Sequence, residues 1–225
     1  MNNTFKAYQV EENEDGSFSS EVKQVPFSVL PDNEVLIKVH FSSLNYKDAL
    51  SATGNKGVTK SYPFIPGIDA SGEVIEDKCN TFTKGDKVIV TGYDLGMNTS
   101  GGFGEFIKVP AGWVVPLPEK ISMLQAMIVG TAGYTAAYGV TRLKRELVTP
   151  QSGEVVVTGA TGGVGSMAVF LLSKLGYSVT AATGKMDQKQ LLEKLGANKI
   201  IHRNELYPEY ILLPLIRLEV KCWKP

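Results

Sequence analysis

Cysteine and histidine are scarce in this chain, and their scarcity restricts the chemistry that its side chains can support. Its 225 residues include only Cys79 and Cys222 as cysteines and His40 and His202 as histidines. Neither cysteine has companions at metal-ligand spacing, and the histidines lie far apart in the sequence, so we expect no metal site. Two widely separated cysteines also suit a reducing cytoplasm better than a disulfide scaffold.

The chain also lacks net charge and long apolar runs. Its 23 Lys and Arg residues balance 23 Asp and Glu residues, so it has no electrostatic footprint for nucleic acid or an anionic membrane. No apolar run is long enough to span a membrane, and the acidic N-terminal region lacks the features of a signal peptide. We therefore expect neither nucleic acid nor a membrane as a partner.

The most informative stretch predicts a strand, a glycine-rich turn and a helix within residues 154–175. Three valines at 155–157 are typical of a buried parallel strand. The glycines between 159 and 165 let the backbone turn sharply and approach a ligand. From Val164 onward, apolar residues recur at helical spacing. A helix N-terminus after such a turn has free N–H groups and partial positive charge, which favour a pyrophosphate.

Four residues of this turn are the candidates for contact with the pyrophosphate: Thr161, Gly162, Gly163 and Val164. The glycine spacing differs from the usual G-x-G-x-x-G, and glycines alone also fit an ordinary turn. The strand before the turn and the helix after it supply the context that phosphate binding requires. We therefore predict a dinucleotide site.

The end of the next predicted strand indicates which dinucleotide is bound. An enzyme that uses NAD carries an acidic residue there to hold the ribose 2′-hydroxyl. This strand instead runs into Thr183, Gly184 and Lys185, where a hydroxyl, an open backbone and a cation suit a 2′-phosphate. Arg203, at the exit of the third strand, could supply a second cation or face water, and Lys185 could equally be a solvated surface residue. The cofactor predicted is NADP(H).

Further elements surround this glycine turn. Asp187 is predicted to cap a helix that ends at Gly196, with Gln190 in the capping-box position. Residues 199–202 form the third strand.

The first half of the chain, to about Pro118, is predicted to be rich in β-structure. Its short strands recur at regular spacing and are separated by turn residues, which suggests a small barrel. The predicted strands cover 5–10, 18–25, 34–39, 72–75, 86–90, 103–109 and 114–117.

Several motifs, in order along the chain, resemble those of the medium-chain dehydrogenase/reductase superfamily. Residues 67–74 (GIDASGEV), 85–88 (GDKV) and 101–105 (GGFGE) are similar to its GroES-like domain. Residues 45–48 (NYKD), 130–136 (GTAGYTA) and 183–185 (TGK) resemble more closely the acryloyl-CoA reductase-like quinone oxidoreductases of the YhdH/YhfP type.

This resemblance implies an α/β plus β fold. A GroES-like barrel would form the catalytic domain over residues 1–122. An incomplete Rossmann domain, a doubly wound parallel sheet, would bind NADP over 123–225 and would begin with a helix around residues 123–143. The resemblance implies a zinc-independent enzyme that uses NADPH to reduce a quinone or an α,β-unsaturated carbonyl compound or thioester. The partner is then a small-molecule substrate in the cleft between the domains.

The resemblance also assigns catalytic residues. Tyr46 matches the family's active-site tyrosine, so it would lie near the nicotinamide and orient the cofactor or donate to a developing enolate oxygen. Asn45 could donate through its amide. Asp69 could be a buried structural carboxylate, while Asp48 is expected at most to form a surface ion pair with Lys47. The proton donor stays unassigned, and Trp113 is expected to be a packing residue rather than a substrate platform.

The resemblance stops after Glu205. Pro208 and Pro214 interrupt any helix in the tail 206–225, whose apolar residues have no clean period. About three strands of the parallel sheet are visible, whereas a complete domain has six. The hypothesis is a truncated or frame-shifted product, and the alternative function is that of an inactive nucleotide-binding fragment. The resemblance implies a homodimer for the full-length family, with the dimer-forming edge in the half that is missing here.

Overall fold

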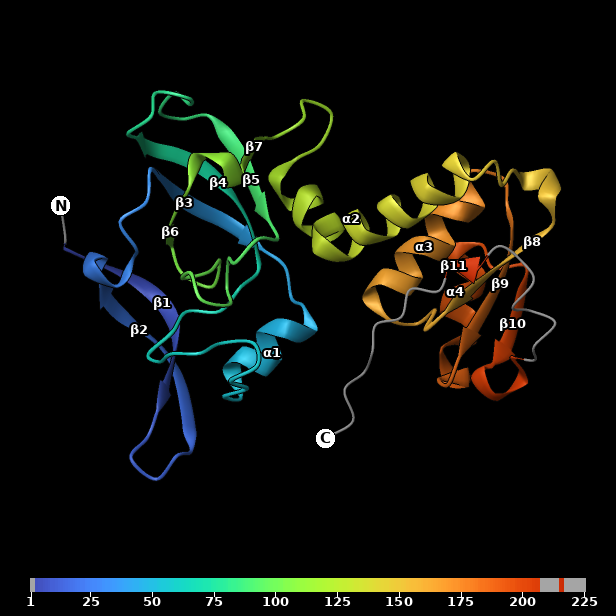
Figure 1. The fold of residues 1–225 in the computed structure, drawn as a ribbon, viewed down its shortest axis with the longest axis horizontal. Helices are drawn as coiled ribbons and strands as arrows, with labels where there is room; N and C mark the ends of the chain where they lie inside the picture. Colours follow the sequence, from blue (N-terminus) through green and yellow to red (C-terminus); the bar gives the residue numbers. More distant parts are fainter. Residues whose placement is uncertain (1–2, 207–214, 217–225) are drawn as a thin grey trace. The chain divides into compact units, whose positions relative to one another are not determined.

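The structure, a computed structural model, describes residues 3–206 and the backbone of residues 215 and 216. The chain divides into two compact units, Met1–Thr131 and Ala132–Pro225, coloured from blue to yellow-green and from there to red in Figure 1. The predicted tail lies outside the described residues except at positions 206, 215 and 216.

Unit 1 contains the predicted β-structure, in two antiparallel sheets. One is a two-stranded hairpin and the other has five strands in the order β6-β3-β4-β5-β7. The strands are β1 Thr4–Glu12, β2 Phe18–Pro26, β3 Val35–Ser42, β4 Asp69–Asp77, β5 Lys87–Thr91, β6 Phe106–Val109 and β7 Val114–Pro116, and the helix α1 is Tyr46–Ala52.

The predicted barrel is not closed. Among the described residues, the edge strands β6 and β7 pair only with β3 and β5 and not with each other. Two single bridges, Ala7–Gly104 and Val10–Phe64, connect the hairpin to the rest of the unit. The edge strands have four and three residues, so they offer few backbone groups with which to close the sheet.

Unit 2 contains a parallel sheet with the strand order β10-β9-β8-β11. In chain order this is 3-2-1-4, the beginning of the doubly wound pattern. The sequence predicted about three strands, and β11 is a fourth, paired with β8. The elements are β8 Glu154–Thr158, α3 Gly163–Lys174, β9 Ser178–Thr183, α4 Lys189–Leu195, β10 Lys199–His202 and β11 Leu215–Ile216.

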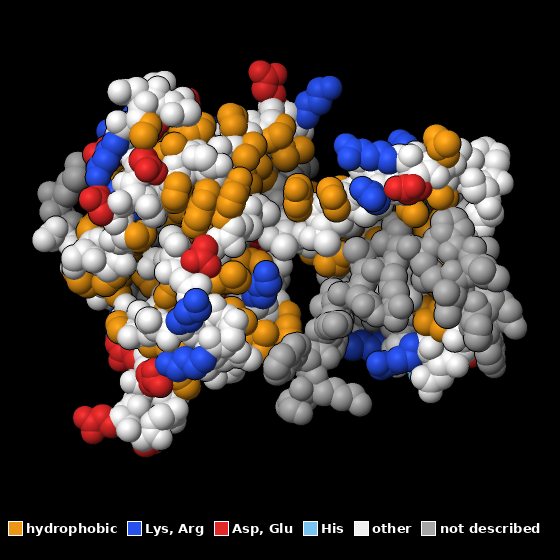
Figure 2. Space-filling model, in the orientation of Figure 1, with side chains coloured by type: hydrophobic (Ala, Val, Ile, Leu, Met, Phe, Trp, Pro, Cys, Tyr) orange, Lys and Arg blue, Asp and Glu red, His pale blue; other side chains and the backbone are white. Residues whose placement is uncertain are grey.

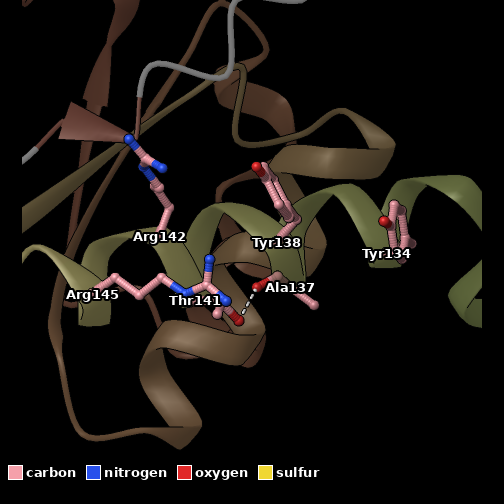
Figure 3. A pocket seen from close by; sticks show the side chains of 6 residues that line it. All are labelled: Tyr134, Ala137, Tyr138, Thr141, Arg142 and Arg145. Carbon is pink, nitrogen blue, oxygen red and sulfur yellow. Dashed lines mark hydrogen bonds between the residues drawn. The ribbon is translucent and has the colours of Figure 1, made fainter.

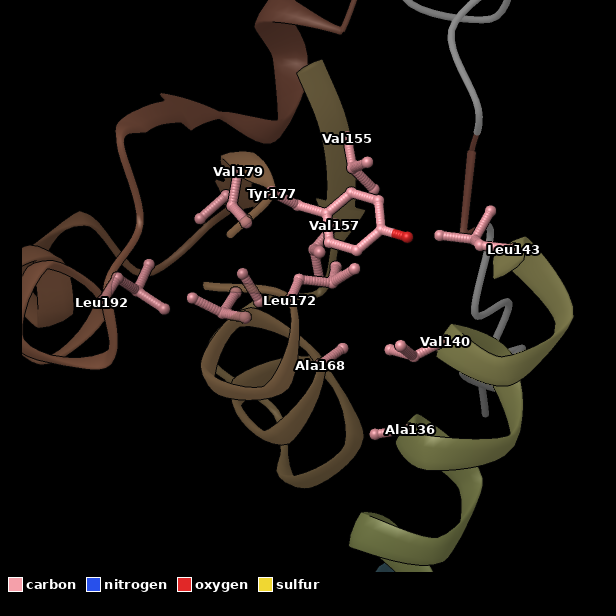
Figure 4. Close-up of a cluster of buried hydrophobic side chains, with 13 residues drawn as sticks. Ala136, Val140, Leu143, Val155, Val157, Ala168, Leu172, Tyr177, Val179 and Leu192 are labelled. Atoms are coloured by element: carbon pink, nitrogen blue, oxygen red, sulfur yellow. The ribbon is translucent and has the colours of Figure 1, made fainter. Parts of the chain in front are cut away.

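Helix α2 spans Met123–Arg145 and is interrupted by a non-helical Gly130. Its part within unit 2 packs on the core of the parallel sheet. In Figure 4, Val140 of α2 points toward Ala168 of α3, and Val157 of β8 lies in the same cluster. The fold class is therefore the predicted α/β plus β.

One capping prediction for unit 2 is wrong. Asp187 does not cap α4, because it lies inside a short 3-10 helix, Met186–Gln188, that precedes it. Gln188 takes the N-cap position instead, without a side-chain hydrogen bond. The predicted end is correct, since Gly196 follows the helix with φ of +99°. No helix in the described part of the chain is both long and apolar enough to cross a bilayer.

Candidate functional site

The glycine turn of unit 2 lies at the carboxyl end of β8, as predicted. Gly162 is the N-cap residue of α3, and no side chain caps the helix through a hydrogen bond. Residue 165 must be glycine for a geometric reason, because a Cβ there would lie 2.2 Å from the carbonyl oxygen of Gly159. The helix can therefore begin directly against the turn, with its first N–H groups lacking intrahelical partners. This is the arrangement that a pyrophosphate needs.

The residues predicted to hold a 2′-phosphate lie together beside this turn. The hydroxyl oxygens of Thr161 and Thr183 are 2.9 Å apart, and the backbone N–H of Lys185 donates to Thr183 Oγ1 at 3.0 Å. A Cβ on Gly184 would lie 2.0 Å from Nη2 of Arg203, so the guanidinium lies directly over that glycine.

Strand register explains why Arg203 reaches Gly184. In the parallel pair β9–β10, Thr183 is the partner of His202, so the residues that follow each strand emerge side by side. Both Lys185 and Arg203 are exposed, and neither forms an ion pair within residues 3–206. The carboxyl end of the sheet thus carries the hydroxyls of Thr161 and Thr183 and the cations of Lys185 and Arg203. No acidic side chain of the described residues pairs with either cation.

The other predicted group lies in unit 1, where β3 ends and β4 begins. Asp69 is fully buried and its carboxylate accepts hydrogen bonds from three residues: Ser43 Oγ, Asn45 Nδ2 at 2.9 Å, and both the N–H (3.0 Å) and Oγ1 (2.7 Å) of Thr131. A carboxylate supplied with this many donors is a structural acceptor, because its oxygens are already occupied. The sequence predicted this structural role.

Asp69 also fixes the break in α2. Gly130 has φ of +48° and ψ of −162°, which frees the N–H of Thr131 from the helical pattern. That N–H donates to Asp69, so a carboxylate from β4 caps the second part of the helix. A Cβ on Gly130 would lie 2.9 Å from Oδ2 of Asp69, so the approach requires glycine.

Asn45 and Tyr46 stand at the start of α1. Both amide hydrogens of Asn45 are directed within the site, to Ser43 Oγ at 2.8 Å and to Asp69 at 2.9 Å. Tyr46 is the first helical residue and is 67% exposed, and its hydroxyl makes no hydrogen bond to another described residue. The Tyr46 hydroxyl is therefore accessible to a ligand, whereas both amide hydrogens of Asn45 are already used.

Asp48 does not form the expected surface ion pair with Lys47. It is buried, and its carboxylate accepts the backbone N–H groups of Asn45 (2.7 Å), Gly67 (3.2 Å) and Ile68 (3.0 Å). Burial raises the pKa of this carboxyl, and the backbone hydrogen bonds oppose that rise. The residue thus links α1 to the loop before β4. No local sequence pattern indicates this role, because the three N–H donors come from two separate segments.

We expect a carbon-13 NMR titration of the Asp48 carboxyl to show a midpoint above the ordinary value of 3.8. The folded state then binds more protons than the unfolded state between the ordinary and the raised pKa. Within that window the free energy of unfolding therefore decreases as pH rises, and above it the contribution is constant. A midpoint at or below 3.8 would show that the backbone hydrogen bonds outweigh burial.

Two hollows in the surface do not contain the predicted site residues. One, of about 230 Å³, lies on α2 in unit 2 beside Tyr134, Tyr138 and Arg142 (Figure 3). The other, of about 610 Å³, lies in unit 1 and is lined by His40 and Glu73, with His40 Nε2 3.6 Å from Oε2 of Glu73. Figure 2 shows hydrophobic side chains gathered on unit 1 over β5 and β7. Within the described part of the chain, no three His, Cys, Asp or Glu side chains are grouped as metal ligands would be.

Comparison with known proteins shows what this fold is similar to. Residues 31–119 match the alcohol dehydrogenase GroES-like domain family. This match and the parallel sheet that follows it agree with the predicted resemblance to the medium-chain dehydrogenase/reductase superfamily.

The chain is similar to particular members of the YhdH/YhfP group. It is 45% identical over 207 residues to the putative quinone oxidoreductase YhfP of Bacillus subtilis. The aligned region covers 92% of this chain and 62% of YhfP. It is 42% identical to the acrylyl-CoA reductase AcuI of Ruegeria pomeroyi, over 90% of this chain and 62% of AcuI.

Solved structures agree with these similarities. The yhdH oxidoreductase from Salmonella enterica in complex with NADP superposes with a TM-score of 0.87 at 45% identity, covering 90% of this chain and 62% of that one. B. subtilis yhfP with NAD bound gives the same TM-score of 0.87 at 44% identity. This chain therefore spans about 62% of the length of the relatives that it matches.

Proposed function

We propose that this chain binds NADP(H) at the carboxyl edge of its parallel sheet and belongs to a zinc-independent reductase of quinones or α,β-unsaturated thioesters. The observation that carries the proposal is the convergence of Thr183, Lys185 and Arg203 beside the glycine turn. The NADP complex of the similar yhdH oxidoreductase supports it. The names of YhfP and AcuI supply the two substrate classes.

The proposal assigns a part of the cofactor to each group of residues in unit 2. Thr161, Gly162, Gly163 and Val164 would hold the pyrophosphate at the N-terminus of α3. Thr183, Gly184, Lys185 and Arg203 would hold the 2′-phosphate, because cations and hydroxyls provide charge-assisted hydrogen bonds to phosphate oxygens. The functional division that we propose is a catalytic domain over 1–122 and an NADP-binding domain over 123–225.

Tyr46 and Asn45 have different parts in the proposed chemistry. When bound, NADPH supplies the hydride. Tyr46 would donate its accessible hydroxyl to the oxygen on which negative charge develops, and no zinc is then needed for that polarisation. Asn45 would hold the loop at the start of α1 in place, because both hydrogens of its amide already bond to Ser43 and Asp69. On the basis of the two widely spaced cysteines, we also propose a cytoplasmic location.

A second candidate function is dinucleotide binding without turnover. The observation that favours it is that the match covers about 62% of the relatives' length. Loss of NADPH absorbance, measured with purified chain and either duroquinone or acrylyl-CoA, separates the two candidates. Turnover that Tyr46→Phe reduces at unchanged NADPH affinity supports the reductase. NADPH binding without turnover of either substrate class supports the second candidate.

Gly184→Ala tests how Arg203 contributes to cofactor choice. The new Cβ would occupy the position of the guanidinium, and this flexible, exposed side chain would have to move away. We expect NADPH affinity to fall by about tenfold, the value of one charge-assisted hydrogen bond. Affinity for NADH should change little, and so should thermal stability. Titration of both cofactors into wild type and variant measures this, and an equal loss for NADH would contradict the assignment.

A further inference from the structure

Tyr93 and Trp113 form an exposed aromatic stack in unit 1 that no role assigned above requires. Their ring centroids are 5.1 Å apart and the ring planes differ by 5°. Trp113 packs against the core of the five-stranded sheet, as the sequence predicted for it. Tyr93 lies on top of it and is 63% exposed. One large aromatic ring is thus supported from behind and presented to solvent.

The backbone of Tyr93 is strained in order to make this arrangement. Its φ is +54°, a left-handed conformation that bulky side chains rarely adopt. Two neighbouring features fix it there: its hydroxyl donates to the carbonyl oxygen of Gly112 at 3.3 Å, and Leu95 is fully buried in the core two residues later. Strain of this kind persists where the surroundings impose it, and it is concentrated at functional sites.

This stack lies at the same end of the strands of the five-stranded sheet as Asp69 and Tyr46. Asp69, at the start of β4, is the register partner of Thr91, at the end of β5, and Tyr93 follows two residues later. Trp113 comes directly before β7, the next strand across. Because neighbouring strands are about 4.8 Å apart, a small molecule beside Tyr93 lies on the order of 10 Å from the end of β3, which precedes Tyr46.

We propose that Tyr93, supported by Trp113, is the platform on which the planar ring of a quinone substrate stacks. The proposal rests on the proposed function and identifies the quinone as its substrate class. A quinone ring is flat and electron-poor, so it stacks well on the electron-rich face of a tyrosine. A platform of this kind recognises a ring without requiring a deep pocket.

Tryptophan fluorescence gives a test that does not depend on turnover. The chain has two tryptophans, so Trp223→Phe makes Trp113 the single reporter. Duroquinone is the probe, because its fully substituted ring resists addition of the exposed Cys79 thiol. Titrated without NADPH, it should quench Trp113 in a saturable way. Tyr93→Asn should weaken this binding by about threefold to tenfold, the range expected for loss of one stacking pair.

Three controls make the test specific. Asparagine adopts positive φ more readily than tyrosine, and this gain offsets the lost stack on Trp113, so Tyr93→Asn should unfold within a few degrees of the parent. Tyr93→Phe loses the long hydrogen bond to Gly112 but retains the ring, its stack on Trp113 and the buried Leu95, so it should retain most of the affinity. Tyr138→Leu removes a tyrosine of similar exposure, 61%, on α2 and should have no effect.

Unsaturable quenching, or equal affinity in Tyr93→Asn, would overturn the platform. If the chain still reduces duroquinone with NADPH in that case, the proposed function stands without it. Saturable quenching in a chain that does not bind NADPH would instead retain the platform and reject the proposed function.

Discussion

Asp69→Ala should lower the free energy of unfolding by about 3 kcal/mol, since each buried donor left without a partner costs about 1–3 kcal/mol. The substitution removes the acceptor of Asn45 Nδ2 and of the N–H and hydroxyl of Thr131. The hydroxyls can rotate toward other acceptors, but the amide and the backbone N–H cannot. Chemical denaturation followed by circular dichroism measures the loss.

Asp77→Ala is the matched control, at the other end of the same strand β4. Asp77 accepts three backbone N–H groups, from Cys79, Thr81 and Phe82, at 2.7–2.8 Å. Water can reach those groups because Asp77 is only partly buried, so we expect a cost of about 1 kcal/mol. If the two variants lose equal stability, Asp69 is not the organising acceptor that its contacts indicate.

Gly165→Ala should destabilise unit 2 and weaken dinucleotide binding together. The added Cβ would lie 2.2 Å from the oxygen of Gly159 and 2.8 Å from the Cα of Ala160, and neither backbone atom can rotate away. Helix α3 must therefore shift, at a cost of about 1–3 kcal/mol, which exceeds the gain of about 1 kcal/mol in helix propensity. Because the N–H groups move with the helix, NADPH affinity should fall by roughly tenfold or more.

Gly163→Ala is the control for the stability measurement. Its Cβ would meet only the Cβ of Ala132, at 3.3 Å, so thermal unfolding should change little. Both variants add the same methyl group to the first turn of the same helix. If they unfold at the same temperature, the contact between Gly165 and Gly159 does not constrain α3.

Local patterns predicted the parallel sheet well, because each of its signals is contained in a few consecutive residues. The valines of β8, the glycine turn and the end of α4 at Gly196 follow from local rules for buried strands, turns and helix caps. Arg203 could be placed near Lys185 because parallel register brings consecutive strand exits together. The capping prediction for Asp187 failed because a 3-10 turn, equally compatible with those residues, precedes the helix.

Contacts between distant segments could not be predicted in the same way. Asp69 and Thr131 are separated by 62 positions, and no periodicity connects them. Asp48 was expected at the surface because it lies next to Lys47 in the sequence, yet its carboxylate accepts three backbone N–H groups in the fold. The open sheet was missed for a related reason, since closure depends on whether short edge strands meet and not on their individual patterns.

We expect Thr183, Lys185 and Arg203 together to recognise a 2′-phosphate, and titration calorimetry of the whole chain with NADPH and NADH is the decisive test. We predict saturable binding with NADPH preferred by about tenfold or more, and loss of that preference in the double variant Lys185→Ala/Arg203→Ala. Lys189→Ala, which removes a nearby cation paired with Glu193 at 3.8 Å, should retain the preference. Equal affinity for the two cofactors, or no binding by a folded chain, would contradict the account.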